Sequence, residues 1–290
     1  SLFAQNRLSG TIPTRIGQLT KTTDFLLSFN QISGSIPTEI GQMRSVDTFK
    51  LFANDITGPL PTELGKLSKI SCFHVSPRLS NSTKKLVGSL PSAHDFWTGL
   101  HDLSLIGNEL SGSIPTEIGY SHSTLWQILL GGNLITGPLP LSIGKSTALQ
   151  CLGLQKNSLT GTLPITIANL LRIWDIWLTA NSLHGQISPS IGKLSNVMEM
   201  QLSRNRFSGT LPFTIGHLST LRRLQFKENS LSGRIPARIG ELEMLRIFEM
   251  QHNDITGTLP SDIGKLQKLR VISVNCNSIT GSIPSEIVHW

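Results

Sequence analysis

The chain has 290 residues, of which 38% are hydrophobic and only 15% are charged, and its formal net charge is +7. Its 26 glycines and 15 prolines are typical of many short strands separated by turns, not of long helices. No stretch approaches the roughly 20 apolar residues of a membrane-spanning helix, so we expect no membrane insertion within this segment.

A repeat of 24 residues organises the chain from its first residues onward. Its marker is an asparagine two positions before a leucine-like residue, and the marker recurs every 24 or 25 residues with one gap of 54. The markers are Asn6, Asn30, Asn54, Asn108, Asn133, Asn157, Asn181, Asn205, Asn229, Asn253 and Asn277. The gap contains one further turn, with Arg78 at the marker position and six extra residues inserted near 77–84. The sequence therefore predicts one solenoid domain over residues 1–290 with about twelve turns.

Each turn follows one pattern, which residues 221–240 show clearly. The alternating segment Leu224-Gln225-Phe226 predicts a short strand whose first and last residues point inward and whose middle residue points outward. One such strand cannot bury its apolar face alone, so neighbouring turns must stack into a continuous parallel sheet. Asn229 ends the strand, because its amide can both donate to and accept from turn backbone. Eleven turns then close with Ile-Pro or Leu-Pro, and a short helical return follows.

The signature Leu-x-Gly-x-Ile-Pro, as in residues 231–236, resembles the plant-type leucine-rich repeat of receptor-kinase ectodomains and polygalacturonase-inhibiting proteins. Similar arrays occur in stramenopile algae such as diatoms. The resemblance covers nearly the whole chain. It implies an α/β solenoid: a right-handed superhelix with a concave parallel sheet, a smaller second sheet beside it, and short 3₁₀ or helical returns on the convex face. It does not identify a ligand, because a fold does not fix a function.

The cysteines and one sequon bear on the setting of the protein. Cys72, Cys151 and Cys276 are too many turns apart for disulfides, so we expect three semi-buried thiols. Plant-type ectodomains usually carry paired cysteines in their end caps, and this departure from the resemblance indicates that the caps are missing through truncation. The sequon at Asn81 lies inside the insertion, where an exposed loop could be glycosylated. Its position favours a secreted or cell-surface protein.

The sequence offers little catalytic chemistry. It contains neither a His-x-x-x-His nor a Cys-x-x-Cys motif, and its glycines belong to the repeat and not to a phosphate-binding loop. We therefore expect no catalytic residues, no metal and no cofactor. Nucleic acid is also disfavoured as a partner, because acidic residues dilute the basic ones and no grouped aromatic platform is present.

The outward position of each strand, four residues before each marker, varies from turn to turn as a recognition surface does. It reads Leu26, Lys50, His74, Ser104, Leu129, Gly153, Trp177, Gln201, Gln225, Glu249 and Ser273. Trp177 is the candidate anchor for a peptide or a sugar face, with Leu129 and Gly153 leaving room beside its ring. The alternative is a ring that lies flat against its neighbours. Gln201, Gln225 and Glu249 complete the predicted binding residues on this column.

A second column, seven residues before each marker, ends in three arginines. Arg222, Arg246 and Arg270 occupy successive turns, and Arg223 lies beside the first of them. Such a stack could bind carboxylates, sulfates or phosphates. The alternative is a solvated edge that nearby acids largely neutralise; these acids are Glu199, Glu228 and Glu249. In the same column, Trp126 and Trp174 are expected to brace the starts of their strands.

Three functions fit these patterns. The first is a non-enzymatic extracellular recognition or adhesion module that binds a peptide, a protein or an acidic glycan on its concave face. The second is a structural or assembly scaffold that works through lateral self-association. The third is an ice-binding solenoid, because serines and threonines flank the turn glycines in pairs such as Thr160/Thr162 and Thr256/Thr258. Pro59, Pro138, Gln186 and Arg234 interrupt that array.

Overall fold

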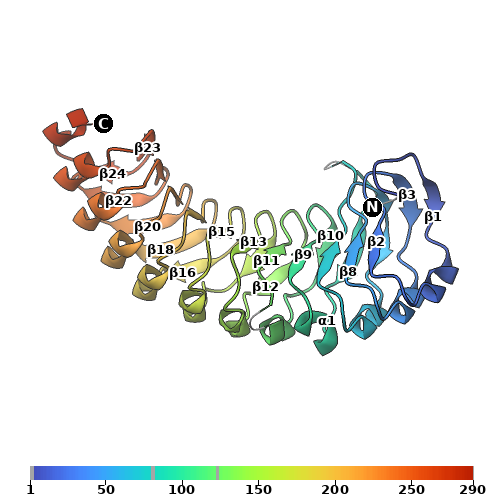
Figure 1. The fold of residues 1–290 in the computed structure, drawn as a ribbon. Coiled ribbons are helices and arrows are strands. Elements are labelled where there is room, and N and C mark those ends of the chain that lie inside the picture. Colours follow the sequence, from blue (N-terminus) through green and yellow to red (C-terminus); the bar gives the residue numbers. More distant parts are fainter. Residues whose placement is uncertain (1–2, 80–81, 122–123, 290) are drawn as a thin grey trace. The chain divides into compact units, whose positions relative to one another are not determined.

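A computed structural model describes residues 3–79, 82–121 and 124–289. The chain falls into two compact units, Ser1–Leu149 and Gln150–Trp290, and within each unit short strands and 3₁₀ helices alternate along the chain (Figure 1). The predicted leucine-rich-repeat solenoid is confirmed by these stacked parallel strands and helical returns. Among the described residues, every helix is too short to span a lipid bilayer.

In the first unit, the main sheet is parallel and its strands follow in chain order: β2 (Asp24–Leu26), β4 (Thr48–Lys50), β7 (Cys72–His74), β9 (Asp102–Ser104) and β11 (Gln127–Leu129). The strands of the second layer are β1 (Ser9–Thr11), β3 (Gln31–Gly34), β5 (Asp55–Ile56), β6 (Gly58–Pro59), β8 (Leu86–Ser89), β10 (Glu109–Ser111) and β12 (Thr136–Pro138). The returns are η1 (Thr14–Gln18), η2 (Thr38–Gln42), η3 (Thr62–Lys66), α1 (His94–Thr98), η4 (Thr116–Ser121) and η5 (Leu141–Lys145).

Strand register locates the insertion. Strand β6 pairs with β8 through Gly58 and Leu86, which are 28 residues apart, whereas β8 pairs with β10 through Val87 and Glu109, only 22 residues apart. The six extra residues therefore lie between β6 and β8, in agreement with the insertion that the repeat spacing predicts near 77–84. Asn81, the predicted glycosylation site, lies outside the described residues.

The second unit repeats the same plan. Its main sheet is β13 (Cys151–Gly153), β15 (Asp175–Trp177), β17 (Glu199–Gln201), β19 (Arg223–Gln225), β21 (Ile247–Glu249) and β23 (Val271–Ser273). The second layer is β14 (Ser158–Thr160), β16 (His184–Gln186), β18 (Arg206–Thr210), β20 (Ser230–Gly233), β22 (Asp254–Gly257) and β24 (Ser278–Ile279). The returns are η6 (Ile165–Asn169), η7 (Pro189–Lys193), η8 (Phe213–His217), η9 (Ala237–Glu241), η10 (Ser261–Lys265) and η11 (Ser285–His289).

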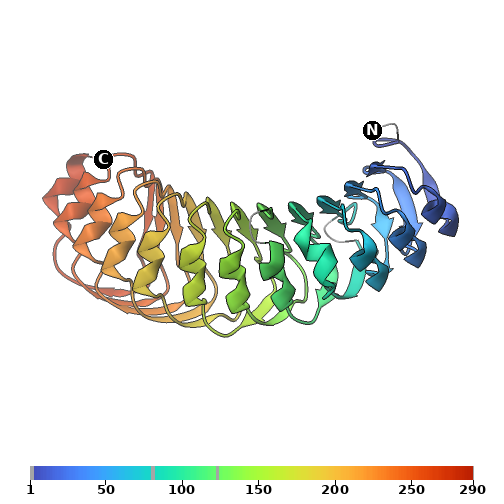
Figure 2. The same cartoon turned by 60° about the horizontal axis from the view of Figure 1, so that its bottom comes forward.

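The core lies between the main sheet and the row of helices that Figure 2 brings forward. In each turn the middle strand residue and the residue after the strand point inward, as do Leu224 and Phe226, which are fully buried. In the first unit, the same inward position carries Phe25, Phe49 and Phe73, whose rings stack with centroids 5.1 and 5.2 Å apart. The first and third residues of each strand therefore point outward. The repeat pattern predicted only the third residue of each strand as outward. The structure adds the first residue of each strand as a second outward column.

The marker asparagines join successive turns. Asn205 shows the pattern: its Nδ2 donates to the carbonyl of Leu202 in its own turn (3.1 Å) and of Leu178 in the preceding turn (2.9 Å). Its Oδ1 accepts from the backbone N–H of Leu183 (3.1 Å). These bonds satisfy backbone groups that the tight turns leave without strand partners, so the predicted role of the asparagines is confirmed.

Candidate ligand-binding face of the second unit

The outward residues of the second unit's main sheet, from β15 to β23, form a surface that we call the strand face. It consists of two rows, read across neighbouring strands in register. One row is Asp175, Glu199, Arg223, Ile247 and Val271; the other is Trp177, Gln201, Gln225, Glu249 and Ser273. The predicted residues Trp177, Gln201, Gln225, Glu249 and Arg223 are thus brought together on one surface.

Trp177 faces outward, as the strand alternation predicts, and it is half-buried. Its indole Nε1 donates to Oε2 of Glu199 on the next strand (3.3 Å), and the same oxygen accepts from Nε2 of Gln201 (2.8 Å). Gly153, in register with Trp177 on β13, is itself buried. That Gly153 leaves room beside the ring stays a prediction.

Two carboxylates lie in register beside this ring, and we call Asp175 and Glu199 the acid pair. Burial raises the pKa of Asp175 above its usual range, and the negative charge of Glu199 raises it further. Glu199 has a partial counter-charge in Arg223, whose Nε lies 3.7 Å from its Oε1. No hydrogen-bond or ion-pair partner of the Asp175 carboxylate is present in the part of the chain that the structure describes. The acid pair is consequently a place where an added positive charge is stabilised.

The far side of the strand face is hydrogen-bonded between neighbouring strands. Nε2 of Gln225 donates to Oε2 of Glu249 in the next turn, so the predicted binding residues Gln225 and Glu249 form a pre-arranged pair. Val271 lies on the last strand of the strand face, β23, and is 40% exposed. A ligand could replace the amide contact of Gln225 without leaving any group buried and unpaired, because both side chains remain half-exposed to water.

Arg222, Arg246 and Arg270 form the arginine column, which runs along the edge of the strand face where the strands begin. Each backbone N–H bonds to the preceding turn, with Arg246 N to Arg222 O and Arg270 N to Arg246 O both 2.8 Å. All three side chains are exposed, and within the described chain none has an ion-pair or hydrogen-bond partner. Three guanidinium groups at strand spacing repel one another, so an anion bound between them would be stabilised.

The acids that were expected to neutralise this column bind elsewhere. Glu228 pairs with Arg204 (3.1 Å) and Lys227 (3.1 Å), Glu199 pairs with Arg223, and Glu249 accepts from Gln225. The three column arginines are exposed to solvent, and among the described residues these acids contact other basic or amide groups, most of them in a neighbouring turn.

Trp174 is a further candidate for ligand contact, which the sequence reasoning assigned to bracing its strand. Its backbone carbonyl accepts from Met198, whose carbonyl in turn accepts from Arg222, so Trp174 begins the column that the arginines end. It is 44% exposed, and Trp126, at the same position in the first unit, is 38% exposed. The expectation that these rings brace their strands does not account for so much open surface. Their position beside a charged edge was visible in the sequence, but their exposure was not.

Leu129 is not part of this group. It is half-buried on the outward side of β11 in the first unit, in register with Ser104 of β9. The cysteines are also placed separately: Cys72 and Cys151 are half-buried as predicted, but Cys276 is exposed. None of the three forms a disulfide.

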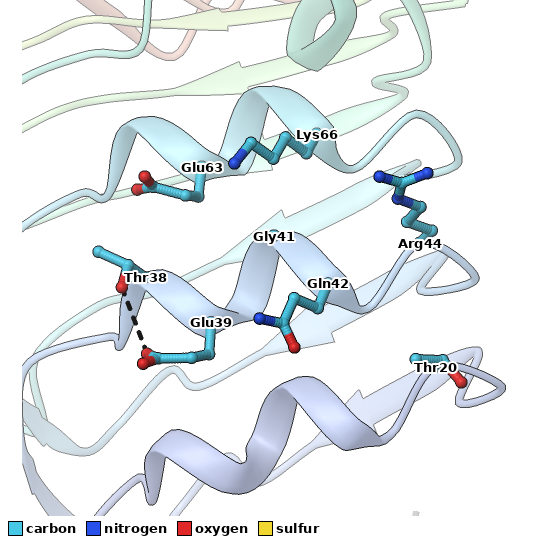
Figure 3. Close-up of a pocket in the computed structure, with 8 residues that line it drawn as sticks. All are labelled: Thr20, Thr38, Glu39, Gly41, Gln42, Arg44, Glu63 and Lys66. Atoms are coloured by element: carbon cyan, nitrogen blue, oxygen red, sulfur yellow. Dashed lines mark hydrogen bonds between the residues drawn. The ribbon is translucent and has the colours of Figure 1, made fainter.

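The first unit has a hollow on its helix side, shown in Figure 3. It is lined by Thr20, Thr38, Glu39, Gly41, Gln42, Arg44, Glu63 and Lys66. Oγ1 of Thr38 donates to Oε2 of Glu39 (3.3 Å), while Arg44 and Lys66 have no ion-pair partner among the described residues. The lining is polar and open, without an apolar wall that could desolvate a ligand, so it carries less weight than the strand face.

The flanking serines and threonines have structural partners. Hydroxyls before the turn glycine donate to the glycine carbonyl of the preceding turn, as Thr256 does to Gly233 (3.3 Å). Threonine methyl groups after the glycine cover the next glycine: a Cβ at Gly233 would lie 2.8 Å from Cγ2 of Thr210. Gly233 also has φ +74°, which glycine adopts without strain. Repeat packing therefore accounts for both hydroxyl columns without an ice surface.

Comparison with known proteins agrees with this architecture. The family model described as Leucine Rich Repeat matches residues 244–266 and 268–290. A crystal structure of a TDR receptor aligns with a TM-score of 0.80 and 29% identity, covering 99% of this chain and 52% of that chain. The ectodomain of the Arabidopsis thaliana receptor kinase GASSHO1/SCHENGEN3, in complex with CASPARIAN STRIP INTEGRITY FACTOR 2, aligns with a TM-score of 0.60 and 31% identity, covering 98% and 42%.

A third match is the ectodomain of the Arabidopsis receptor kinase HAESA in complex with a peptide hormone ligand, with a TM-score of 0.65, 25% identity, and coverage of 97% of this chain and 58% of that chain. This chain thus spans about half the length of these three receptor structures. No curated protein sequence matches it. The repeat, the stacked sheet and these similarities identify the fold as a leucine-rich-repeat solenoid, with repeats that resemble the plant type.

Proposed function

We propose that the chain is a non-enzymatic extracellular recognition module whose strand face in the second unit binds a peptide or a peptide segment of a protein. The observation that carries the proposal is a separation of charge across one surface. The acid pair is half-buried beside Trp177, whereas the arginine column is exposed and without partners along the edge. A ligand with a cationic group and a carboxylate some distance apart satisfies both ends.

The chemistry at each end is specific. A lysine or arginine of the ligand would lie against the acid pair, where burial makes an unpaired carboxylate costly. A carboxylate of the ligand would bridge guanidinium groups of the arginine column, which can bind it through two parallel hydrogen bonds. The ring of Trp177 offers apolar area between them, and Trp174 extends that area towards the column.

Similarity to receptor ectodomains supports a peptide over other ligands. HAESA binds a peptide hormone, and the chain resembles that ectodomain over 97% of its own length. These solved structures are ectodomains, which supports an extracellular setting for this chain as well. An acidic glycan would satisfy the arginine column but would leave the carboxylate of Asp175 without a counter-charge, so a peptide is the better fit.

The proposal is tested by screening the purified chain against a library of synthetic peptides and against polygalacturonate. Wild type is compared with Trp177→Ala and with the triple variant Arg222→Ala/Arg246→Ala/Arg270→Ala. We expect peptide binding that each variant weakens at least about tenfold, because central aromatic and arginine contacts dominate binding energy. The matched control removes three exposed positive charges elsewhere in the unit: Lys193→Ala/Arg206→Ala/Arg234→Ala.

Three results would contradict the proposal. The control triple could weaken binding as much as the arginine-column triple, which would indicate a non-specific charge effect. Polygalacturonate alone could bind, which would make the ligand a glycan. Finally, the chain could bind nothing and self-associate in sedimentation experiments with Trp177→Ala having no effect, which would favour the scaffold function.

A further inference from the structure

Three side chains that carry metal-binding atoms meet on the outward side of the first unit's main sheet. Cys72 and His74 are the first and third residues of β7, and Asp102 lies in register with Cys72 on β9. Nε2 of His74 lies 2.9 Å from Oδ2 of Asp102 and 3.5 Å from Sγ of Cys72. The three candidate ligand atoms all lie within 4.8 Å of one another.

The group is not arranged as a catalytic triad. A nucleophilic cysteine needs one imidazole nitrogen to take its proton and the other nitrogen to bond the carboxylate. Here the thiol and the carboxylate both approach Nε2 of His74. Three donor atoms from three side chains therefore converge on one point in space, which is the arrangement that a bound cation requires.

One oxygen of the group lacks a hydrogen-bond partner among the described residues. It is Oδ1 of Asp102, which is buried, and only 13% of the aspartate side chain is exposed.

We propose that Cys72, His74 and Asp102 bind a single Zn²⁺ ion on the outward side of the first unit's sheet. The donor set is one thiolate, one imidazole nitrogen and one carboxylate oxygen. Thiolate selects zinc over calcium and magnesium, and three protein ligands leave the fourth tetrahedral position for water or for a donor atom of a bound partner. This proposal is independent of the peptide-binding face of the second unit.

Two of the three ligand–ligand distances fit a tetrahedral ion after a small adjustment. With usual zinc–ligand lengths, a thiolate sulfur and an imidazole nitrogen are about 3.5 Å apart, and a nitrogen and a carboxylate oxygen about 3.4 Å apart. The cysteine–histidine distance of 3.5 Å already agrees, and the histidine–aspartate distance of 2.9 Å must widen by about half an ångström. Lys50 lies in register with His74 on β4, where its positive charge opposes the binding of a cation, and it is not one of the proposed ligands.

The second unit contains a natural comparison. Cys151 and Asp175 are in register on neighbouring strands, as Cys72 and Asp102 are, but Gly153 stands where the histidine would be. With two donors in place of three, that position should bind zinc much more weakly. Cys151 is therefore the matched control for Cys72 within the same protein.

The test measures the Zn²⁺ content of the whole chain by mass spectrometry after equilibration with ZnCl₂ and dialysis, and the absorption of the Co²⁺-loaded chain. We expect about one metal per chain, with a thiolate-to-cobalt band. Cys72→Ala and His74→Ala should abolish the band, Asp102→Asn should weaken binding at least about tenfold, and Cys151→Ala should change neither. Circular dichroism shows whether each variant is folded.

A second measurement needs no variant. Alkylation by iodoacetamide, followed by peptide mass spectrometry, reports each thiol of the wild-type chain separately. Zn²⁺ should slow alkylation of Cys72 at least about tenfold and leave Cys151 and Cys276 unchanged. Equal protection of all three thiols, no protection of Cys72, or a cobalt band that survives in folded Cys72→Ala would each overturn the proposal.

Discussion

Replacing Asn253 with alanine is the sharpest test of how the solenoid is held together. Asn253 is only 8% exposed, and its Nδ2 donates to the carbonyls of Phe226 (2.9 Å) and Met250 (3.0 Å). Its Oδ1 accepts from the backbone N–H of Leu231 (2.9 Å), a fully buried residue in the preceding turn. The substitution removes these bonds, together with a longer one from Nδ2 to the carbonyl of Gln251 (3.4 Å).

The expected cost follows from what remains. The carbonyls of Phe226 and Met250 each keep another donor, Nδ2 of Asn229 and of Asn277, so each lost bond costs about 1 kcal/mol. The N–H of Leu231 loses its acceptor inside the core, which costs about 1–3 kcal/mol. Asn253→Ala should therefore lower the free energy of unfolding by about 3–5 kcal/mol.

Urea unfolding followed by circular dichroism measures the loss, and amide hydrogen exchange locates it. The amide of Leu231 should exchange faster by more than the amides of the first unit, because repeat proteins lose stability locally. The control is Asn6→Ala. Asn6 is the marker of the first turn, it is exposed, and it donates only to Phe3 and Ala4 of its own turn. Equal losses in the two variants, or a loss below about 1 kcal/mol for Asn253→Ala, would refute the reasoning.

Two further substitutions test the packing and the electrostatics. Gly240→Ala should destabilise the chain by about 1–3 kcal/mol in urea unfolding, because a Cβ there would lie 2.3 Å from the backbone oxygen of Asp262 on η10. The control is Ala168→Gly, at the same position of η6, which should cost less than about 1 kcal/mol. Equal effects of the two substitutions would contradict the close-contact explanation. Asp175→Asn should raise stability near neutral pH, because the pKa of Asp175 is raised in the folded chain and stability is lost as pH rises through that range. At about pH 3 the carboxyl is protonated in both states, so the gain should vanish there, and a gain that persists at pH 3 would argue against a charge effect.

The sequence predicted the fold in detail because the repeat encodes it at every level. Three signals recur at the same offset in each turn: strand alternation, the marker asparagines and the closing Ile-Pro pairs. A turn that departs from the pattern can therefore still be assigned from the turns on either side of it. The six-residue insertion was visible as a change of spacing, and the register of β6 and β8 confirms it. The return after the insertion is the short α-helix α1 and not a 3₁₀ helix, a choice that the repeat pattern left open because it predicts either kind of helical return.

The sequence predicted the placement of those candidate site residues that belong to one column of the repeat. The outward position of Trp177 and the stacking of the arginine column followed from spacing alone. The acid pair was missed because the sequence analysis followed only one of the two outward residues in each strand, which left Asp175 unexamined. The pairing of Cys72, His74 and Asp102 was missed for a different reason: Asp102 lies 30 residues after Cys72 across the insertion, so no short metal-binding motif exists to signal it.

Hydroxyl-radical footprinting of the chain with a peptide captured in the screen tests the central claim most directly. Trp174, Met198 and Trp177 report on the strand face and its edge, and Phe213 on η8, 57% exposed, reports on the helix side. The account predicts that bound peptide protects Trp177 and Trp174 from oxidation and leaves Phe213 unchanged. Protection of Phe213 with no change at either tryptophan would contradict it and would place recognition on the helices.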